Sequence, residues 1–185
     1  MANTTPNFGL LQPLTSETFD LNEYNTNLSK IDTGMNNPTN IQTKLPLGLV
    51  AKVESTAQNP NITSLFVWLA VQFTFKANRN YRCEFYGGVT SNLANSEALA
   101  HLYTDLSSNS STNTTGLTEI QGTNIFVNNA SNQTVKFYVK RDIKYTSDTT
   151  VWLKGVLDPI GDTLTTQAGT TYPGQLTITD MGMQI

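Results

Sequence analysis

The stretch Phe66–Lys76, FVWLAVQFTFK, decides the fold class of this chain. Its apolar residues recur at every second position, which is the period of a β-strand. Its first half is apolar at consecutive positions, so we expect that half to be covered on both sides. Phe66 and Trp68 supply the second apolar face. A subunit contact and the N-terminal segment are the two covers that the sequence offers.

Similar alternation returns along the rest of the chain at intervals of about 8–15 residues, with turn residues between the apolar stretches. Leu49, Ala51 and Val53, for example, are expected to share one face of the first strand. No helical pattern separates these stretches, so the sequence predicts a mainly β fold, an antiparallel β-sandwich or jelly roll. The expected strands are 47–54, 66–76, 81–86, 97–105, 123–127, 135–140, 151–157 and 176–178.

The segment Phe19–Asp32, FDLNEYNTNLSKID, is the one stretch with a convincing helical pattern. Asp20 suits an N-cap, and Pro38 stops the helix. A helix this short is marginal alone in water, so its apolar stripe needs a partner: copies of itself, the β-domain or another protein. The stripe repeats as a heptad seam, made of Leu14, Leu21, Leu28 and Met35 with Tyr24 and Ile31 between them.

A linker rich in Gly, Pro and amide side chains, residues 33–46, follows the helix. The sequence therefore predicts an attachment and oligomerisation segment at 1–45 and a β-sandwich domain at 46–185. Phe8 and Leu10 stand out as apolar residues in the polar leader before the helix. Either they tuck against the domain or they dock into another protein.

Composition argues against several classes of partner. The net charge of −3 and the scattered Lys and Arg residues argue against nucleic-acid binding. No run is long and apolar enough to span a membrane, and no signal peptide is recognisable, so a role outside the cell would follow lysis. Cys83 is the only cysteine, which excludes an internal disulfide. The low charged fraction and abundant Asn, Thr and Ser are typical of extracellular and virion β-proteins.

We expect no catalytic site, metal or cofactor. His101 is the only histidine, which excludes a multi-histidine metal site within one chain. A Cys83–His101 nucleophile–base pair is conceivable, but Cys83 falls on an inward face, where cysteine behaves as a small hydrophobe. Asp158 and Asp162 flank a Pro-Ile-Gly turn and read as ordinary turn residues.

Two groups of motifs resemble proteins of tailed phages. The leader PNFGL at 6–10 and the helix segment NTNLSKID at 25–32 resemble the N-terminal attachment region of phage fibre and appendage proteins. The motifs PLGLVA at 46–51, FTFKANRNYR at 73–82 and LTITDMG at 176–182 resemble a small domain in virion proteins of phages that infect actinobacteria. The resemblance implies a structural protein of the virion, a homotrimer, and contacts with other virion proteins of the capsid or tail.

The first functional hypothesis is therefore a virion appendage, short fibre or decoration protein. Its N-terminal segment would attach it, and three copies would converge their apolar stripes. The residues expected to oligomerise or attach are Phe8, Leu10, Leu14, Leu21, Tyr24, Leu28, Ile31, Phe66 and Trp68.

A second hypothesis is recognition of a host-surface glycan by two loops, 106–116 and 163–173, which have little to bury. Exposed aromatic side chains of the same domain could stack on sugars. A third class, a glycan-cleaving enzyme, needs a carboxylate pair that only the fold can reveal. The residues expected to meet a host are Ser107, Asn109, Thr112, Asn113, Thr170 and Tyr172.

Overall fold

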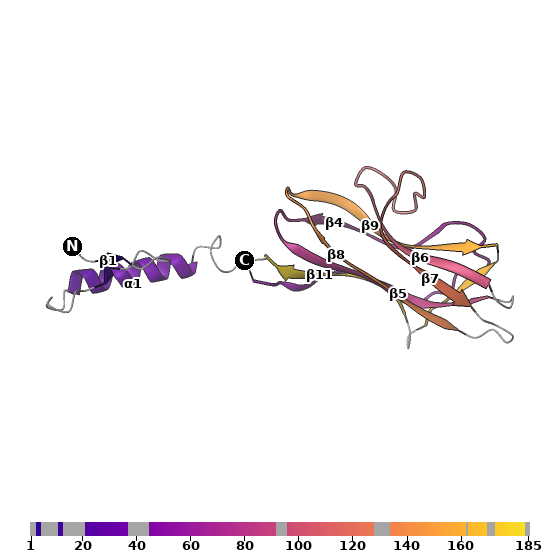
Figure 1. Ribbon diagram of the computed structural model, residues 1–185, viewed down its shortest axis with the longest axis horizontal. Coiled ribbons are helices and arrows are strands. Elements are labelled where there is room, and N and C mark those ends of the chain that lie inside the picture. The colour runs from indigo at the N-terminus through magenta and orange to yellow at the C-terminus, as the bar shows by residue number, and fades with distance from the viewer. Residues whose placement is uncertain are drawn as a thin grey trace. The chain divides into compact units, whose positions relative to one another are not determined.

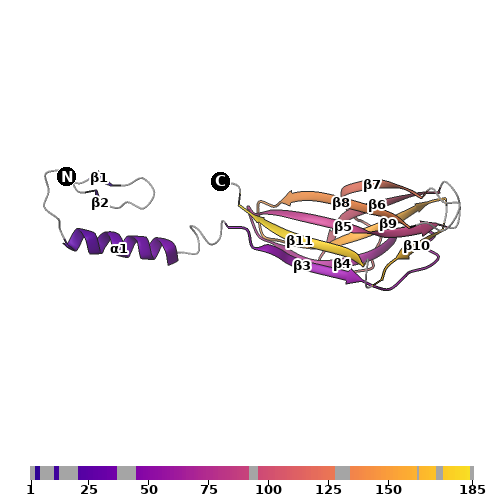
Figure 2. The same cartoon turned by 90° about the horizontal axis from the view of Figure 1, so that it is seen from below.

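The structure is a computed structural model that describes residues 3–4, 11–12, 21–36, 45–91, 96–127, 134–161, 163–169 and 173–183. The chain divides into two compact units, Met1–Leu45 and Pro46–Ile185. Figures 1 and 2 show the elements of each unit. Within the described residues, no helix has both the length and the hydrophobicity needed to cross a lipid bilayer.

The first unit holds one helix and a small strand pair. Helix α1 spans Leu21–Asn36. Strands β1 (Asn3–Thr4) and β2 (Leu11–Gln12) pair antiparallel. The helix runs four residues past its predicted end, so part of the predicted linker is helical. Gly34 costs only about 1 kcal/mol inside a helix, whereas the position before Pro38 resists helical geometry.

The second unit consists of two antiparallel sheets (Figure 2). One sheet has the order β8–β5–β11–β3, with β10 also paired to β5, and the other has the order β4–β9–β6–β7. The first contains β3 (Gly48–Ser55), β5 (Asn80–Ser91), β8 (Val135–Lys144), β10 (Leu164–Gln167) and β11 (Gly174–Gly182). The second contains β4 (Phe66–Phe75), β6 (Ser96–Leu106), β7 (Thr118–Val127) and β9 (Thr149–Ile160).

This architecture confirms the predicted fold class, a mainly β, antiparallel sandwich with one short N-terminal helix. All of the expected strands are present. Strand β10 was not expected, since residues 163–173 read as a loop. Its sequence LTTQ contains one strongly apolar residue, Leu164, which gives too short a pattern to distinguish a strand from a loop.

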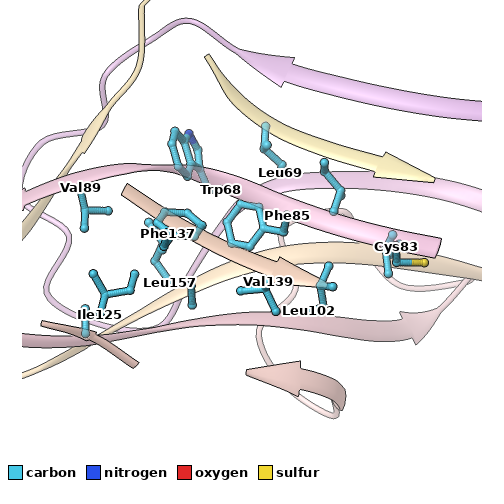
Figure 3. Close-up of a cluster of buried hydrophobic side chains, with 14 of the residues drawn as sticks. Trp68, Leu69, Cys83, Phe85, Val89, Leu102, Ile125, Phe137, Val139 and Leu157 are labelled. Carbon is cyan, nitrogen blue, oxygen red and sulfur yellow. The ribbon is translucent and has the colours of Figure 1, made fainter. Parts of the chain in front are cut away.

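The core lies between the two sheets and is built around Trp68 and Phe85 (Figure 3). Strand β4 shifts register against β9 between Val67 and Leu69, so Trp68 is the extra residue of a β-bulge. The bulge turns Trp68 into the core, with its ring centroid 6.1 Å from that of Phe85. Phe66 also packs against the core. The second apolar face that the sequence predicted at Phe66 and Trp68 is therefore covered within the domain, and Trp68 is not available for a subunit contact.

A second bulge changes the face of Leu49. Ile178 pairs with Ala51 and Thr179 pairs with Leu49, which leaves Val50 as the extra residue. Val50 packs against the core, while Leu49 is 57% exposed. The expectation that Leu49 shares a face with Ala51 and Val53 is wrong because strict alternation does not survive a bulge.

A buried ion pair joins two segments far apart in the sequence, near the point where Pro46 enters the domain. The guanidinium of Arg79 donates to both carboxylate oxygens of Asp180, at 2.6 and 2.8 Å. The backbone N–H of Gly182 also donates to Asp180, at 2.7 Å. The hydrogen bonds that Arg79 donates to Asp180 raise the pKa of Arg79 above its ordinary value. The pair therefore ties the turn after β4 to the end of β11.

Candidate functional site

In the five-stranded sheet, one edge of β5 is paired with two strands in succession, and we call these two strands a strand line. The strand line is broken where the first strand ends and the second begins. Strands β10 and β11 both run antiparallel to β5, one after the other. Gln167 at the end of β10 pairs with Gly88, and Gln175 of β11 pairs with Tyr86. Between these two pairs, β5 contributes only Gly87, whereas on the opposite side β10 ends at Gln167 and pairing with β5 resumes at Gln175. Gly87 therefore has no pairing partner in β10 or β11, although it pairs with Phe137 of β8 on its other side.

A pocket of about 780 Å³ occupies this break, which we call the strand-break pocket. Its walls come from β5, β8 and the two ends of the broken strand line. Its polar side chains are two amides, two hydroxyl groups and one ammonium group. The described lining residues are Tyr86, Gly87, Gly88, Thr134, Lys136, Phe137, Gln167, Ala168, Gly169, Pro173 and Gln175.

The indole of Trp68 lies directly behind the break. A Cβ on Gly87 would lie 2.5 Å from Cζ3 of Trp68, and one on Gly174 would lie 2.5 Å from Cη2. Both positions therefore need glycine, because the ring fills the space that a side chain would take. The indole Nε1 is buried and finds no hydrogen-bond partner within the described residues.

The two amides of the pocket are held in place by neighbouring side chains. Gln167 donates to the hydroxyl of Thr90 and accepts from the amide of Gln58, both at 3.0 Å. Gln175 donates to Glu54 at 2.5 Å and accepts from the hydroxyl of Tyr86. A carboxamide offers two N–H donors and two acceptor lone pairs. Each amide therefore keeps one donor and one acceptor for a further partner.

Two tyrosines extend the polar and aromatic surface beside the pocket. Tyr86 pairs across the strands with Tyr138, and their ring centroids are 6.4 Å apart. Tyr138 is 53% exposed and donates its hydroxyl to Glu84. This hydrogen bond raises the pKa of Tyr138 to about 12. Burial raises the pKa of Tyr86. Both phenols therefore remain neutral hydrogen-bonding groups near pH 7.

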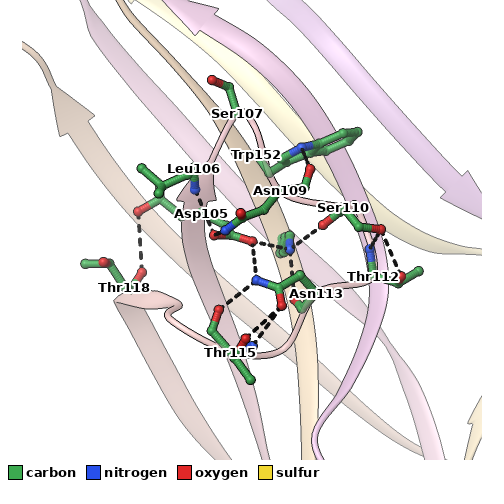
Figure 4. A network of polar contacts seen from close by, with 12 residues as sticks. Asp105, Leu106, Ser107, Asn109, Ser110, Thr112, Asn113, Thr115, Thr118 and Trp152 are labelled. Atoms are coloured by element: carbon green, nitrogen blue, oxygen red, sulfur yellow. Dashed lines mark hydrogen bonds and ion pairs between the residues drawn. The ribbon is translucent and has the colours of Figure 1, made fainter.

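The other sheet carries a closed polar site under the loop of residues 107–117, which we call the capping loop (Figure 4). Lys154 of β9 and Asp105 of β6 form an ion pair of 2.6 Å in which both side chains are 0% exposed. The Lys154 ammonium also donates to the carbonyls of Ser110 at 3.0 Å and Asn113 at 2.8 Å. All three of its N–H donors are therefore used.

Asp105 is equally well satisfied. It accepts from the backbone N–H of Leu106 at 2.8 Å and from the amides of Asn109 at 2.6 Å and Asn113 at 3.0 Å. Burial would raise the pKa of the carboxyl, but the hydrogen bonds from Lys154, Asn113, Asn109 and Leu106 lower it to about 2. Asp105 is therefore ionised at neutral pH and holds the loop from inside.

These contacts correct the expectation that the capping loop buries almost nothing. Asn109 and Asn113, predicted to meet a host, are half-buried and direct their amides to Asp105. Ser107 and Thr112 are exposed, in agreement with an accessible surface there. The predicted contact residues Thr170 and Tyr172 lie outside the described residues. Sequence reasoning missed Lys154, although a lysine between Trp152 and Val156 on one strand face is a recognisable signal.

The predicted attachment residues are only partly described. Tyr24 and Leu28 expose 48% and 45% of their surface, and Ile31 is half-buried. Leu21 is the first residue of α1, but its side chain lies outside the description. Phe8, Leu10 and Leu14 lie outside the described residues.

The residues considered for catalysis or metal binding, Cys83 and His101, lie among packing and hydrogen-bonding neighbours. Burial raises the pKa of Cys83 to about 12, so its thiol stays protonated at neutral pH. His101 contacts Glu119 through Nδ1 at 2.7 Å and packs on the ring of Tyr103. Among the described residues, no three His, Cys, Asp or Glu side chains are grouped to hold a metal ion. Asp162 is outside that description.

Comparison with known proteins assigns no family to the chain. No family model matches the sequence. No curated protein matches it. Among solved structures, the chain is similar to one titled "Structure of Eiger TNF from S. frugiperda", with a TM-score of 0.39 and 5% sequence identity. That alignment covers 69% of this chain and 96% of the other. A likeness this distant carries no argument about function.

Proposed function

We propose that this chain is a structural appendage protein of a phage virion, a homotrimer attached through its N-terminal segment and displaying its β-sandwich. The observation that carries the proposal is the apolar stripe of α1. Tyr24 and Leu28 remain about half exposed within a single chain. Burying a large apolar side chain contributes roughly 1.5–3 kcal/mol, so the stripe gains stability when copies of the helix meet.

Heptad spacing suits such an assembly. Leu21 and Leu28 are seven residues apart, and Tyr24 and Ile31 occupy the complementary positions. This repeat keeps one stripe facing its partners along the whole helix. Joining copies through the helix also raises the local concentration of the attached β-domains, so a weak contact between domains becomes effective.

The β-domain has an exposed apolar patch that an oligomer would cover. Leu47, Leu49 and Met181 are exposed by 64%, 57% and 42%. Leu49 pairs with Thr179, so these residues lie together where β3 begins and β11 ends. Strand β3 is at the sheet edge, where exposed apolar residues favour association. A contact between copies at this edge would remove these apolar side chains from water.

The resemblance to phage proteins supports placing the assembly in a virion. Two of its β-domain motifs, FTFKANRNYR and LTITDMG, meet through the Arg79–Asp180 pair. These two β-domain motifs thus belong to one structural unit. The leader and helix motifs belong to the separate N-terminal unit. This division matches a protein with one part for attachment and another for display.

Light scattering on the full chain tests the oligomer. One chain has a mass of 20.3 kDa, so a trimer has about 61 kDa. We expect Leu21→Asp with Leu28→Asp to give monomers whose β-domain unfolds at an unchanged temperature. The matched control, Thr26→Asp with Thr33→Asp, introduces the same charges at the same spacing on the opposite helix face and should remain trimeric. Retention of the trimer in the leucine variant would overturn the role of the stripe.

Placement in the virion needs a separate measurement. Antibodies against residues 46–185 should label regular positions on purified phage particles in electron micrographs. The same antibodies, preadsorbed with the β-domain, provide the control. Particles that contain no copy of this chain would overturn the virion assignment while leaving the oligomer intact.

A further inference from the structure

We propose that the strand-break pocket binds a neutral, hexose-containing glycan. This binding role goes beyond the proposed appendage function and does not depend on it, because the pocket is built within one β-domain. Strand β5 is paired on either side of Gly87, with β10 up to Gln167 and with β11 from Gln175. The pocket lies where this pairing is interrupted.

The walls of the pocket are preorganised. Each of the amides of Gln167 and Gln175 already has one donor and one acceptor engaged by a neighbour. Their positions are therefore fixed before any ligand arrives, which reduces the entropy lost on binding. The Tyr86 hydroxyl is fixed in the same way by its bond to Gln175.

The remaining hydrogen-bonding capacity matches sugar hydroxyls. Each amide keeps one N–H and one lone pair, a donor and an acceptor on one planar group. Each hydroxyl of a vicinal diol can both donate and accept, so such a diol is complementary to this pair. Gln167 and Gln175 stand on opposite sides of Gly87, at the two ends of the broken strand line. Two neighbouring sugar units can therefore be held, one by each amide.

The aromatic surface suits the apolar faces of sugar rings. Tyr138 is half exposed beside Tyr86, and its hydroxyl is tethered to Glu84. A tyrosine offers an apolar ring and a polar end to the same ligand. The tether holds the ring in place next to the pocket, where a bound saccharide would extend along the sheet.

Charge favours a neutral ligand. The one charged group in the described lining is Lys136, and the carboxylate of Glu54 stands nearby through its bond to Gln175. The two opposite charges balance, so the pocket has no excess of either sign to attract a strongly charged ligand. Open pockets with a few fixed polar groups among apolar ones are the usual form of small-ligand sites.

Isothermal titration calorimetry with the full chain tests this proposal. The probes are maltohexaose, cellohexaose, mannohexaose and laminarihexaose. We expect saturable binding of at least one of them. Gln167→Ala and Gln175→Ala should each weaken that binding about tenfold, the effect of one lost hydrogen bond. Gln121→Ala removes an amide from the other sheet and should leave the affinity unchanged.

A plug variant separates the pocket from the capping loop. Gly169 lines the pocket and a Cβ there meets nothing within 4 Å, so Gly169→Trp is expected to place its indole in the pocket. We expect it to weaken binding more than fiftyfold (roughly two lost hydrogen bonds or more) while the mass in solution stays unchanged. Thr112→Trp on the capping loop should bind normally.

Two outcomes would overturn the inference. One is the absence of saturable heat with all of the probes. The other is loss of binding in Thr112→Trp with full binding in Gly169→Trp, which would place the site on the capping loop. Either result leaves the trimer test unaffected, so a failure of this inference can be told apart from a failure of the proposed assembly.

Discussion

The capping loop and the strand-break pocket each lie over a buried polar group. The two regions differ in how many hydrogen-bond partners they give to that group. Under the capping loop, Lys154 uses all three N–H donors and Asp105 accepts from every neighbour in reach. Behind the pocket, the indole N–H of Trp68 has no partner within the described residues. The first arrangement closes the surface, and the second leaves it hollow. Because the hydrogen-bonding groups of Lys154 and Asp105 are all used, we assign them a structural role. The strand-break pocket keeps unused hydrogen-bonding groups, and there we place the ligand.

The largest expected effect is that of Lys154→Met, which tests whether the buried ion pair stabilises the capping loop. Removing one partner leaves Asp105 as an unpaired buried charge, which costs about 3–5 kcal/mol. Urea unfolding followed by tryptophan fluorescence measures the loss, since both tryptophans lie in the β-domain. Lys140→Met, at an exposed lysine, is the control and should change stability by less than about 0.5 kcal/mol. A loss below about 1 kcal/mol in Lys154→Met would show that the pair does not hold the loop.

On the pocket side, Gly174→Ala should cost about 2–3 kcal/mol. Its new Cβ would overlap the Trp68 ring, which the core holds in place. The control is Gly169→Ala, five residues earlier, whose new Cβ meets nothing within 4 Å, so its stability should be unchanged. Thermal unfolding of the two variants gives the comparison. Equal stability of the two would mean that Trp68 does not fill the space behind the break.

Acid should weaken the capping loop more than the pocket. The pKa of Asp105 is lowered to about 2 in the folded chain, so its contribution is present above the ordinary pKa and is lost as the pH falls towards 2. We expect a loss of about 2 kcal/mol between pH 5 and pH 2 from this group. The difference in unfolding free energy between the parent chain and Asp105→Asn isolates it. A constant difference across this pH range would contradict the assignment.

The smallest expected effect is at Trp152, whose indole donates to the carbonyl of Asn109 at 2.9 Å. Trp152→Phe should cost about 1 kcal/mol, the value of one hydrogen bond. The effect should be local, so limited proteolysis within residues 107–117 is the measurement. Tyr138→Phe, which removes an exposed hydrogen bond, is the control. Unchanged cleavage would show that Trp152 does not restrain the loop.

The sequence predicted the strands well because their inner faces alternate plainly. Val135, Phe137 and Val139, for example, point inward along β8 as expected. The prediction of inward and outward faces was wrong where a bulge interrupts the alternation of side chains along a strand. The bulges at Val50 and Trp68 shift the faces of their strands, and no local residue pattern announces them. Strand β10 was missed because its short polar sequence is held by its neighbour β5 rather than by its own propensity.

The candidate sites were harder to predict for a related reason. The loop residues Asn109 and Asn113 looked accessible, because a sequence of Asn, Ser and Thr gives no sign that two side chains turn inward. The partner that turns them, Asp105, is held in turn by Lys154, far along the chain. The pocket depends on Gly87 facing a break between two other strands. Such features arise from pairing between distant segments.

The strand break also affects how the domain tolerates changes in chain length. Strand β10 ends at Gln167 and β11 begins at Gly174, and both strands pair with the same edge of β5. Each strand has its own register with β5, so residues added between the two strands leave both registers unchanged, and a longer connection costs little entropy. The position is thus a natural place for sequence variants to differ in length and, in engineered versions, for a foreign peptide to be displayed.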